Sequence, residues 1–210
     1  MKDIFVIGTL LACILCIPAD HLKRGLSRRE TDEGESIEGT SGGSTVDFSK
    51  FQDAGKCFSI PATYYGYYRS YLDDPVLADM CIAAKQVGVP VNGSVTFDFV
   101  YERNGETIYR PSVHTNLCST PESDVQDCFR MPVHDLPGAE YVEYKFLYFK
   151  CGDCLLMWMP QYSESSCVLG VTDMNNIDES CHQAYDYYCA PSKFFIHDED
   201  MCPEVYSVLQ

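Results

Sequence analysis

The chain has 210 residues, 46% of them apolar, and 31 acidic against 15 basic residues give a formal net charge of -16 at pH 7. A surface this acidic repels phosphate backbones and anionic lipid headgroups, which argues against nucleic-acid binding and against electrostatic docking on a membrane. A chain of this length typically forms one domain with a core of its own.

Residues 1–19 have the form of a secretory signal peptide. Lys2 precedes an apolar run from Ile4 to Ile17, and Pro18-Ala19 offers a small residue for cleavage. That run is short for a membrane span, and no later run reaches the ~18 apolar residues that a membrane helix needs. We therefore expect a secreted, extracellular protein without membrane insertion.

Residues 20–46 form a leader of a different composition. They contain two dibasic pairs, an acidic run from Glu30 to Glu38 and a stretch rich in Ser and Gly. Such a segment buries too little apolar area to offset its chain entropy, so we predict disorder here and one folded domain over residues 47–210.

Cleavage after Ala19 leaves ten cysteines, at positions 57, 81, 118, 128, 151, 154, 167, 181, 189 and 202. An even number in an oxidising compartment indicates up to five disulfides. Cys151 and Cys154 have the C-x-x-C spacing of a metal or redox motif, but no second such pair follows and the five histidines are scattered. We expect disulfides, no metal site and no cofactor.

From Phe48 onward the pattern is mostly that of β-strands. Val95, Phe97, Phe99 and Tyr101 alternate with other residues at the period of a strand with one buried face. Similar runs occupy about residues 62 to 71, 81 to 87, 106 to 115, 140 to 149, 154 to 160 and 166 to 173. Tight reversals are predicted at Asn92-Gly93, Asn104-Gly105 and Pro137-Gly138. Asn92-Gly93-Ser94 is also a glycosylation sequon.

Two helices complete the pattern. Ile177, Cys181, Ala184, Tyr185 and Tyr188 lie on one helical face, and Pro191 ends that run. A short early helix is predicted within residues 47–57, with Asp47 as its N-cap. The fold class is therefore all-β, an eight-stranded antiparallel barrel with a C-terminal α-helix and a short N-terminal helix, because closure removes exposed strand edges. The motifs of hydrolases, metalloproteases and phosphate-binding loops are absent from the sequence, so we do not expect an enzyme.

Several of these residues resemble a known family, the tick salivary lipocalins of the histamine-binding-like group. Asp53-Ala-Gly-Lys56, Tyr64-Tyr65, Arg69-Ser-Tyr-Leu-Asp-Asp-Pro75 and Cys81 follow the order and spacing of its N-terminal half, and Cys154, Cys181 and Cys202 follow its C-terminal half. The resemblance covers roughly residues 47 to 203. It implies a lipocalin barrel that binds a small host mediator of inflammation, such as an amine or a lipid, in the saliva of a tick.

The resemblance also implies two disulfides, Cys81–Cys202 and Cys154–Cys181. For the other six cysteines sequence does not determine the pairing. We expect Cys118 with Cys128 across a short hairpin, Cys151 with Cys167 between neighbouring strands, and Cys57 with Cys189 by elimination.

Amine binders of the group use carboxylates and aromatic rings, because a buried ammonium needs an opposite charge. Tyr71 and Asp74 occupy two of those positions here, although a strand-end role before Pro75 is the simpler explanation of Asp74. At three other positions this chain differs from the amine-binding pattern of the family, which places acidic residues where this chain has Leu155, Val168 and Lys145. We therefore expect a poor histamine or serotonin binder.

The loss of acidic residues at these three positions favours an alternative, a pocket for a lipid. If Tyr71 points inward, strand alternation places Arg69 and Tyr67 on the same face. Arg69 and Lys145 would then hold a carboxylate, with Phe97, Phe99, Leu155 and Met157 as apolar wall, so a fatty acid or eicosanoid is implied. Two simpler explanations stay open: Arg69 pairs with Asp73 at the rim, and Lys145 faces solvent.

A competing hypothesis places the function on the exterior. Tyrosines crowd residues 64 to 71 and 185 to 188, and an outward set would suit a surface that blocks a host protein such as a complement component, protease or receptor. Filling of the barrel and packing beneath the helix explain the same tyrosines. In either case we expect a monomer.

Overall fold

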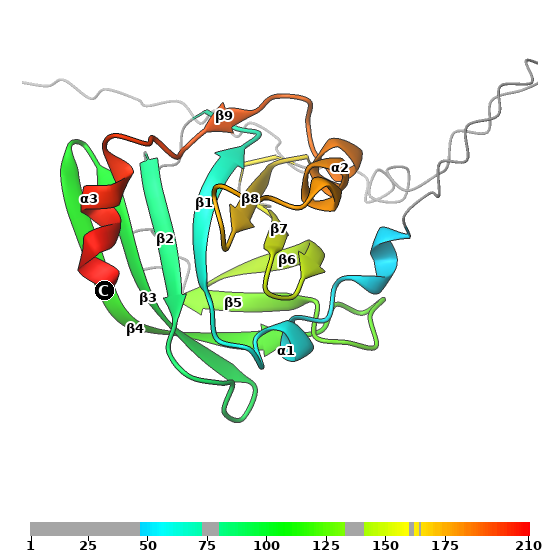
Figure 1. The fold of residues 1–210 in the computed structure, drawn as a ribbon. Coiled ribbons are helices and arrows are strands. Elements are labelled where there is room, and N and C mark those ends of the chain that lie inside the picture. The colour runs from blue at the N-terminus through cyan, green and yellow to red at the C-terminus, as the bar shows by residue number, and fades with distance from the viewer. Residues whose placement is uncertain (1–46, 73–79, 133–140, 160–161, 164) are drawn as a thin grey trace, which may run out of the picture. The chain divides into compact units, whose positions relative to one another are not determined.

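Eight antiparallel strands follow one another around a closed barrel in this computed structural model (Figure 1). The structure describes residues 47–210 except 73–79, 133–140, 160–161 and 164, and these residues belong to one compact unit, Thr45–Gln210. The strands are β1 (Thr63–Arg69), β2 (Met80–Gln86), β3 (Ser94–Arg103), β4 (Glu106–Cys118), β5 (Cys128–Pro132), β6 (Tyr141–Lys150), β7 (Cys154–Trp158) and β8 (Cys167–Val171). Each pairs with the next, and β1 pairs with both β2 and β8, which closes the barrel and confirms the predicted fold class.

The strand that the alternation pattern did not predict within the barrel is β5. It has five residues, and its last is Pro132, which cannot donate to a ladder. A run this short shows too few alternations to be recognised. A second unpredicted strand, β9 (Phe194–Phe195), extends the sheet by pairing with Tyr68 and Arg69 of β1.

Two Asn-Gly pairs form the tight reversals expected of them. Asn104 and Gly105 join β3 to β4 with φ of 54° and 79°, and Asn92 and Gly93 precede β3 with φ of 52° and 76°. Two successive residues in the left-handed region define the hairpin turn that asparagine and glycine tolerate best. The third predicted reversal, at Pro137, lies outside the described residues.

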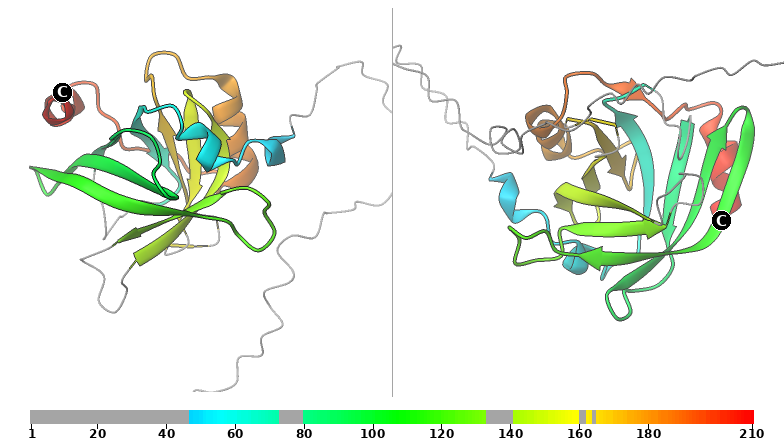
Figure 2. Two further views of the ribbon diagram at one scale, coloured as in Figure 1. Left: turned by 90° about the horizontal axis from the view of Figure 1, so that it is seen from below. Right: turned by 180° about the vertical axis from the view of Figure 1, so that it is seen from behind.

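Buried side chains form one cluster inside the barrel and two on its outer face. The inner cluster is mainly aromatic, with Phe58 in edge contact with Phe97 and Phe146 at centroid distances of 5.4 and 5.7 Å. The outer clusters lie beneath the helices α2 and α3, which Figures 1 and 2 show against different strands. The hydrophobic core thus has one part inside the barrel, around the cavity, and two parts between the barrel wall and the helices.

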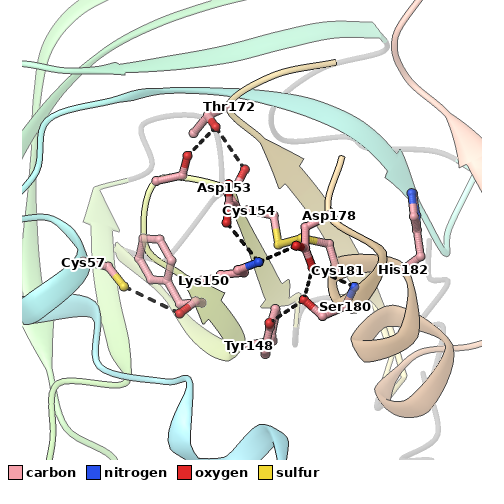
Figure 3. The surroundings of a disulfide bond; sticks show 12 residues. Cys57, Tyr148, Lys150, Asp153, Cys154, Thr172, Asp178, Ser180, Cys181 and His182 are labelled. Carbon is pink, nitrogen blue, oxygen red and sulfur yellow. Dashed lines mark hydrogen bonds and ion pairs between the residues drawn. A yellow bond between two sulfur atoms is a disulfide. The ribbon is translucent and has the colours of Figure 1, made fainter. Parts of the chain in front are cut away.

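The helix α2 (Glu179–Tyr188) has the face that the sequence predicts. Cys181, Ala184 and Tyr185 are fully buried against the outer surface of the barrel. Asp178 caps the helix by accepting a hydrogen bond from the Ser180 backbone N–H at 2.9 Å. Figure 3 shows Lys150 of β6 pointing to the same carboxylate, with which it forms an ion pair.

The C-terminal helix α3 (Cys202–Tyr206) continues into a 3-10 turn, η3 (Ser207–Leu209), over β2 and β3. Tyr206 packs its ring on Tyr65 of β1 at a centroid distance of 4.8 Å. Val205 and Leu209 bury their side chains in the same cluster. The C-terminal segment therefore covers part of the outer wall.

The early helix differs from the prediction. Residues 47–57 form a 3-10 turn, η2 (Phe48–Lys50), and a separate helix α1 (Ala54–Cys57). Asp53 is the N-cap, accepting from the Lys56 backbone N–H at 3.0 Å, whereas Asp47 forms an ion pair with Lys50 at 3.3 Å. The cap moves because the chain bends between the two turns.

Five disulfides link the ten cysteines, and three of them are as expected: Cys81–Cys202, Cys154–Cys181 and Cys118–Cys128. The expected pairs Cys151–Cys167 and Cys57–Cys189 are wrong. The structure pairs Cys57 with Cys151 and Cys167 with Cys189, at Cα distances of 4.6 and 5.8 Å. The reason is tertiary: α1 lies beside the β6–β7 turn, and the end of α2 lies beside the start of β8.

The expected signal peptide and leader, residues 1–46, lie outside the described residues. Within the part of the chain that the structure describes, no helix combines the length and apolar character needed to cross a membrane.

Candidate ligand-binding cavity

Strand β1 changes the side of the barrel that its side chains face partway along. Tyr64 and Gly66 face inward, and the register with β8 then shifts between Gly66 and Tyr68. This β-bulge inserts one residue, so Tyr68 points outward and Arg69 is the next residue inside. Tyr67 packs with the outer cluster, its ring 5.2 Å from that of Tyr68. The expectation that Tyr67 faces inward is wrong because strict alternation does not continue through a bulge.

The barrel encloses a cavity that leaves about 90 Å³ to the centres of water molecules. Phe58, which follows α1, lies at one end, and Tyr71, which follows β1, lies at the other. Six residues that the sequence predicts as ligand contacts line it: Arg69, Tyr71, Phe97, Phe99, Leu155 and Met157.

Sequence reasoning missed much of the remaining lining, notably Phe58, Phe129, Met131, Tyr144, Phe146 and Val168. Tyr144 and Phe146 carried a usable signal, since they alternate with charged residues along a recognised strand. Phe129 and Met131 lie on the unrecognised strand β5. Phe58 had no signal, because it reaches the cavity from a connection rather than from a strand.

Lys145 lies on the outer face of β6, between two residues that line the cavity. Its Nζ is 3.8 Å from Oδ2 of Asp127, a carboxylate that is 1% exposed. Asp127 also accepts hydrogen bonds from the backbone N–H and the hydroxyl of Thr120, at 2.7 and 2.6 Å. The expectation that Lys145 points into the barrel is therefore wrong, since strand alternation gives the interior to its two neighbours.

Arg69 brings a positive charge into this aromatic environment. The residue is 5% exposed, and its Nη2 donates a hydrogen bond to the Leu72 carbonyl at 2.6 Å. Its guanidinium carbon is 5.1 Å from the ring centre of Tyr71, and Tyr71 stacks on Tyr162 at 4.2 Å. Three side chains thus form a polar and aromatic rim at one end of the cavity.

The described residues that line the cavity include no aspartate or glutamate. Asp74, predicted as a ligand contact, and Asp73, the suggested rim partner of Arg69, both lie outside the described residues. The described part of the cavity is therefore lined mainly by apolar side chains, with the guanidinium of Arg69 among them.

Tyr64 places a hydroxyl deep in the same cavity. The residue is 4% exposed, and its Oη has no hydrogen-bond partner among the described residues. Burial raises the pKa of Tyr64 well above its usual value, so the phenol stays neutral. A buried hydroxyl that lacks a partner is unfavourable, and a polar atom of a ligand can supply one.

The family model described as tick histamine binding protein matches residues 46–204. The chain belongs to the tick histamine-binding protein family. It is thus a lipocalin of a ligand-binding family and not an enzyme. No curated protein sequence matches the chain.

Solved structures support the fold of this tick histamine-binding family member. The AM182 serotonin complex is 13% identical, with a TM-score of 0.53, and the match covers 74% of this chain and 96% of that one. Lobster apocrustacyanin A1 is 10% identical, with a TM-score of 0.52, covering 76% and 90%. Japanin from Rhipicephalus appendiculatus bound to cholesterol also matches, at 18% identity and a TM-score of 0.48, covering 70% and 98%.

The positions that the sequence resemblance aligns with acidic residues of amine binders can now be placed. Leu155 and Val168 line the cavity of this family member. Each contributes a hydrocarbon surface where the family pattern implies a carboxylate. The wall of the cavity is therefore hydrocarbon at these two inward positions.

Proposed function

We propose that this protein is secreted in tick saliva and sequesters an anionic lipid of the host, a fatty acid or an eicosanoid, in its barrel. The observation that carries the proposal is Arg69, a buried guanidinium that lines a cavity otherwise made largely of aromatic and aliphatic side chains. Removal of a free lipid mediator from the bite would lower the inflammatory response of the host.

Charge favours an acid over an amine at this site. A carboxylate can accept two parallel hydrogen bonds from a guanidinium, which is the strongest pairing that side chains offer. An ammonium beside Arg69 would instead meet a like charge. The proposed ligand therefore has its acidic group at the rim formed by Arg69, Tyr71 and Tyr162.

The remainder of the cavity suits a hydrocarbon chain. From the rim inward the walls carry Met157, Leu155 and Phe97, and Phe58 lies at the far end. Burying an acyl chain against such walls stabilises the complex by about 0.8 kcal/mol for each CH₂ group. The Tyr64 hydroxyl, which has no hydrogen-bond partner among the described residues, additionally favours an oxygenated chain, as in an eicosanoid, over a saturated one.

Secretion is supported by the cysteines as well as by the predicted signal peptide. All ten cysteines of the described domain are oxidised to disulfides, which persist in extracellular compartments and not in the cytosol.

A host protein as the partner is the second candidate, and the tyrosines of β1 lend it little support. Tyr65 packs beneath Tyr206, and Tyr68 packs beneath Tyr185 at 4.5 Å. The exposed aromatic residues that favour this candidate are Tyr187, at 71% exposure, and Phe195, at 59%. Binding of a host protein through them would leave the cavity unused.

The test compares a lipid acid with its neutral ester. The protein should bind arachidonic acid, and Arg69→Gln should weaken that binding roughly 10- to 100-fold, the range of one charge-assisted hydrogen bond. Arachidonic acid methyl ester should bind both proteins alike. Arg130→Gln is the matched control, since Arg130 lies on the outer face and pairs with Glu143 at 2.9 Å.

Equal loss of the acid and the ester in Arg69→Gln would show that Arg69 supports the fold rather than the charge of a ligand. Tighter binding of histamine or serotonin than of any lipid would overturn the proposal. Native mass spectrometry of protein from an oxidising host would identify a co-purified ligand directly.

A further inference from the structure

The connection between β2 and β3 exposes apolar side chains. Val87, Val89 and Val91 are 47%, 55% and 65% exposed, and none belongs to a buried cluster. We call these three residues the valine loop. These three exposed apolar side chains lie within five consecutive residues on a protein of high net negative charge.

Asn92 stands directly after the valine loop at the tip of a tight turn. The backbones of Val91 and Ser94 exchange hydrogen bonds at 2.9 and 3.0 Å, and Leu117 of β4 donates to the Gly93 carbonyl at 2.8 Å. Asn92 itself is exposed, and its φ of 52° directs it away from the regular path of the strand. The turn is therefore rigid in its backbone and open at the asparagine.

We propose that Asn92 carries an N-linked glycan and that this glycan covers the valine loop. The proposal rests on the secretion part of the proposed function and not on the ligand. Asn92-Gly93-Ser94 is the acceptor sequence, and an exposed turn has room for a bulky hydrophilic group. The glycan would leave the chain at the residue next to Val91, close enough for its first sugars to shield the valine loop.

The modification is a transfer from a lipid diphosphate that carries an oligosaccharide. The side-chain nitrogen of Asn92 forms a bond to the anomeric carbon of the first sugar as the bond from that carbon to the phosphate oxygen breaks. The amide loses one proton, and the lipid diphosphate leaves.

The glycan would not obstruct the cavity. Gln86 donates hydrogen bonds to the carbonyls of Phe58 and Gly88 at 2.6 and 2.7 Å, which ties the valine loop to the end of the barrel that Phe58 closes. Figure 1 shows the β2–β3 connection projecting at the end where α1 lies. The rim at Tyr71 belongs to the other end, so ligand binding should not depend on the glycan.

The first measurement is the intact mass of the full chain secreted from eukaryotic cells. Peptide N-glycosidase should lower that mass by one glycan and convert Asn92 to aspartate, which peptide mapping detects. The variant Ser94→Thr keeps the acceptor sequence and should carry the glycan, whereas Ser94→Ala should not. Secreted protein with unmodified Asn92 would overturn the proposal.

The second measurement tests the cover. Asn92→Asp has the chemistry of the enzymatically deglycosylated protein, and aspartate tolerates the left-handed backbone. Both should self-associate at rising concentration in sedimentation velocity, and adding Val87→Ser, Val89→Ser and Val91→Thr should restore the monomer. Val208→Thr, at a valine of η3 that is 45% exposed, close to the value for Val87, is the control that should not restore it.

A glycan-free protein that stays monomeric at every concentration would show that the valine loop needs no cover. Affinity for arachidonic acid is measured on the same samples. Its failure in all of them would count against the ligand proposal alone, because mass and association are read independently.

Discussion

A guanidinium inside an aromatic barrel is stable only if its donors and its charge are compensated. Arg69 donates a hydrogen bond to the Leu72 carbonyl, and its guanidinium carbon lies 5.1 Å from the ring centre of Tyr71. A bound carboxylate would form charge-assisted hydrogen bonds with this guanidinium, so the proposed class of ligand depends on Arg69.

Tyr64 provides the second prediction at this scale. Tyr64→Phe removes a buried hydroxyl that has no partner among the described residues, so the ligand-free protein should be about 1 kcal/mol more stable to denaturant. The same change should weaken binding of a hydroxylated eicosanoid about tenfold and leave a saturated fatty acid unaffected. Calorimetry with the two lipids gives the comparison.

Tyr206→Phe serves as the control for Tyr64→Phe, because Tyr206 is a largely buried tyrosine on the outer wall. It should change neither affinity. A similar loss for both lipids in Tyr64→Phe would mean that the hydroxyl shapes the cavity and does not bind the ligand.

Among the elements, β1 and α2 show how one strand serves two layers. Before its bulge β1 contributes Tyr64 to the cavity, and at the bulge it turns Tyr68 beneath α2. The hydroxyl of Tyr68 reaches Nδ1 of His182 at 2.9 Å, which fixes the helix on that side. Because of the bulge, two consecutive residues face opposite sides of the barrel wall: Tyr68 packs against α2 on the outside, and Arg69 lines the cavity.

Asp178 gives a prediction about α2. Hydrogen bonds from Lys150 and then from Ser180 lower the pKa of Asp178 from 3.8 to about 2. A carboxyl whose pKa is lower in the folded state stabilises the fold above its unfolded pKa, and that stability is lost as pH falls through the folded value. The unfolding free energy should therefore drop between about pH 4 and pH 2.

Two variants separate the cap from the ion pair. Asp178→Ala should lower the unfolding free energy at pH 7 by about 1 kcal/mol through loss of the N-cap. Asp178→Asn keeps a capping side chain, so it should be less destabilised and should show a smaller drop below pH 4. An unchanged acid profile in Asp178→Asn would contradict the assignment.

At the scale of the whole molecule the barrel is closed by hydrogen bonds and the outer segments are held by disulfides. Cys81–Cys202 ties α3 to β2, Cys154–Cys181 and Cys167–Cys189 tie α2 to the wall, and Cys57–Cys151 ties α1 to the β6–β7 turn. The attachment of these outer segments therefore does not depend on the packing of side chains inside the barrel, where the cavity lies.

The disulfides should differ in their effect on stability. Cys81–Cys202 closes 121 residues and Cys118–Cys128 closes 10. In the chain-entropy model these loops correspond to about 5 and about 3 kcal/mol. Replacing the first pair by alanine should therefore lower the denaturation midpoint more than replacing the second, and the reverse order would contradict the model. Non-reducing peptide mapping of the native protein checks the pairings themselves.

Much of this protein follows from local pattern. Alternation along residues 95 to 101, the Asn-Gly turns and the helical face of Cys181, Ala184 and Tyr185 each depend on a few neighbouring residues, and they were enough to predict the barrel and its helix. The resemblance supplied two disulfides and the family.

Other features needed contacts between distant segments. Arg69 faces the cavity and Tyr67 does not, because a bulge interrupts the pairing of β1 with β8. Lys145 faces outward because of the register of β6 with its neighbours β5 and β7. The partners of Cys57 and Cys189 depend on where α1 and α2 pack. The periodicity of a sequence predicts that a strand has two different faces. Which face lines the cavity is determined by the register of the strand with strands that are remote in sequence.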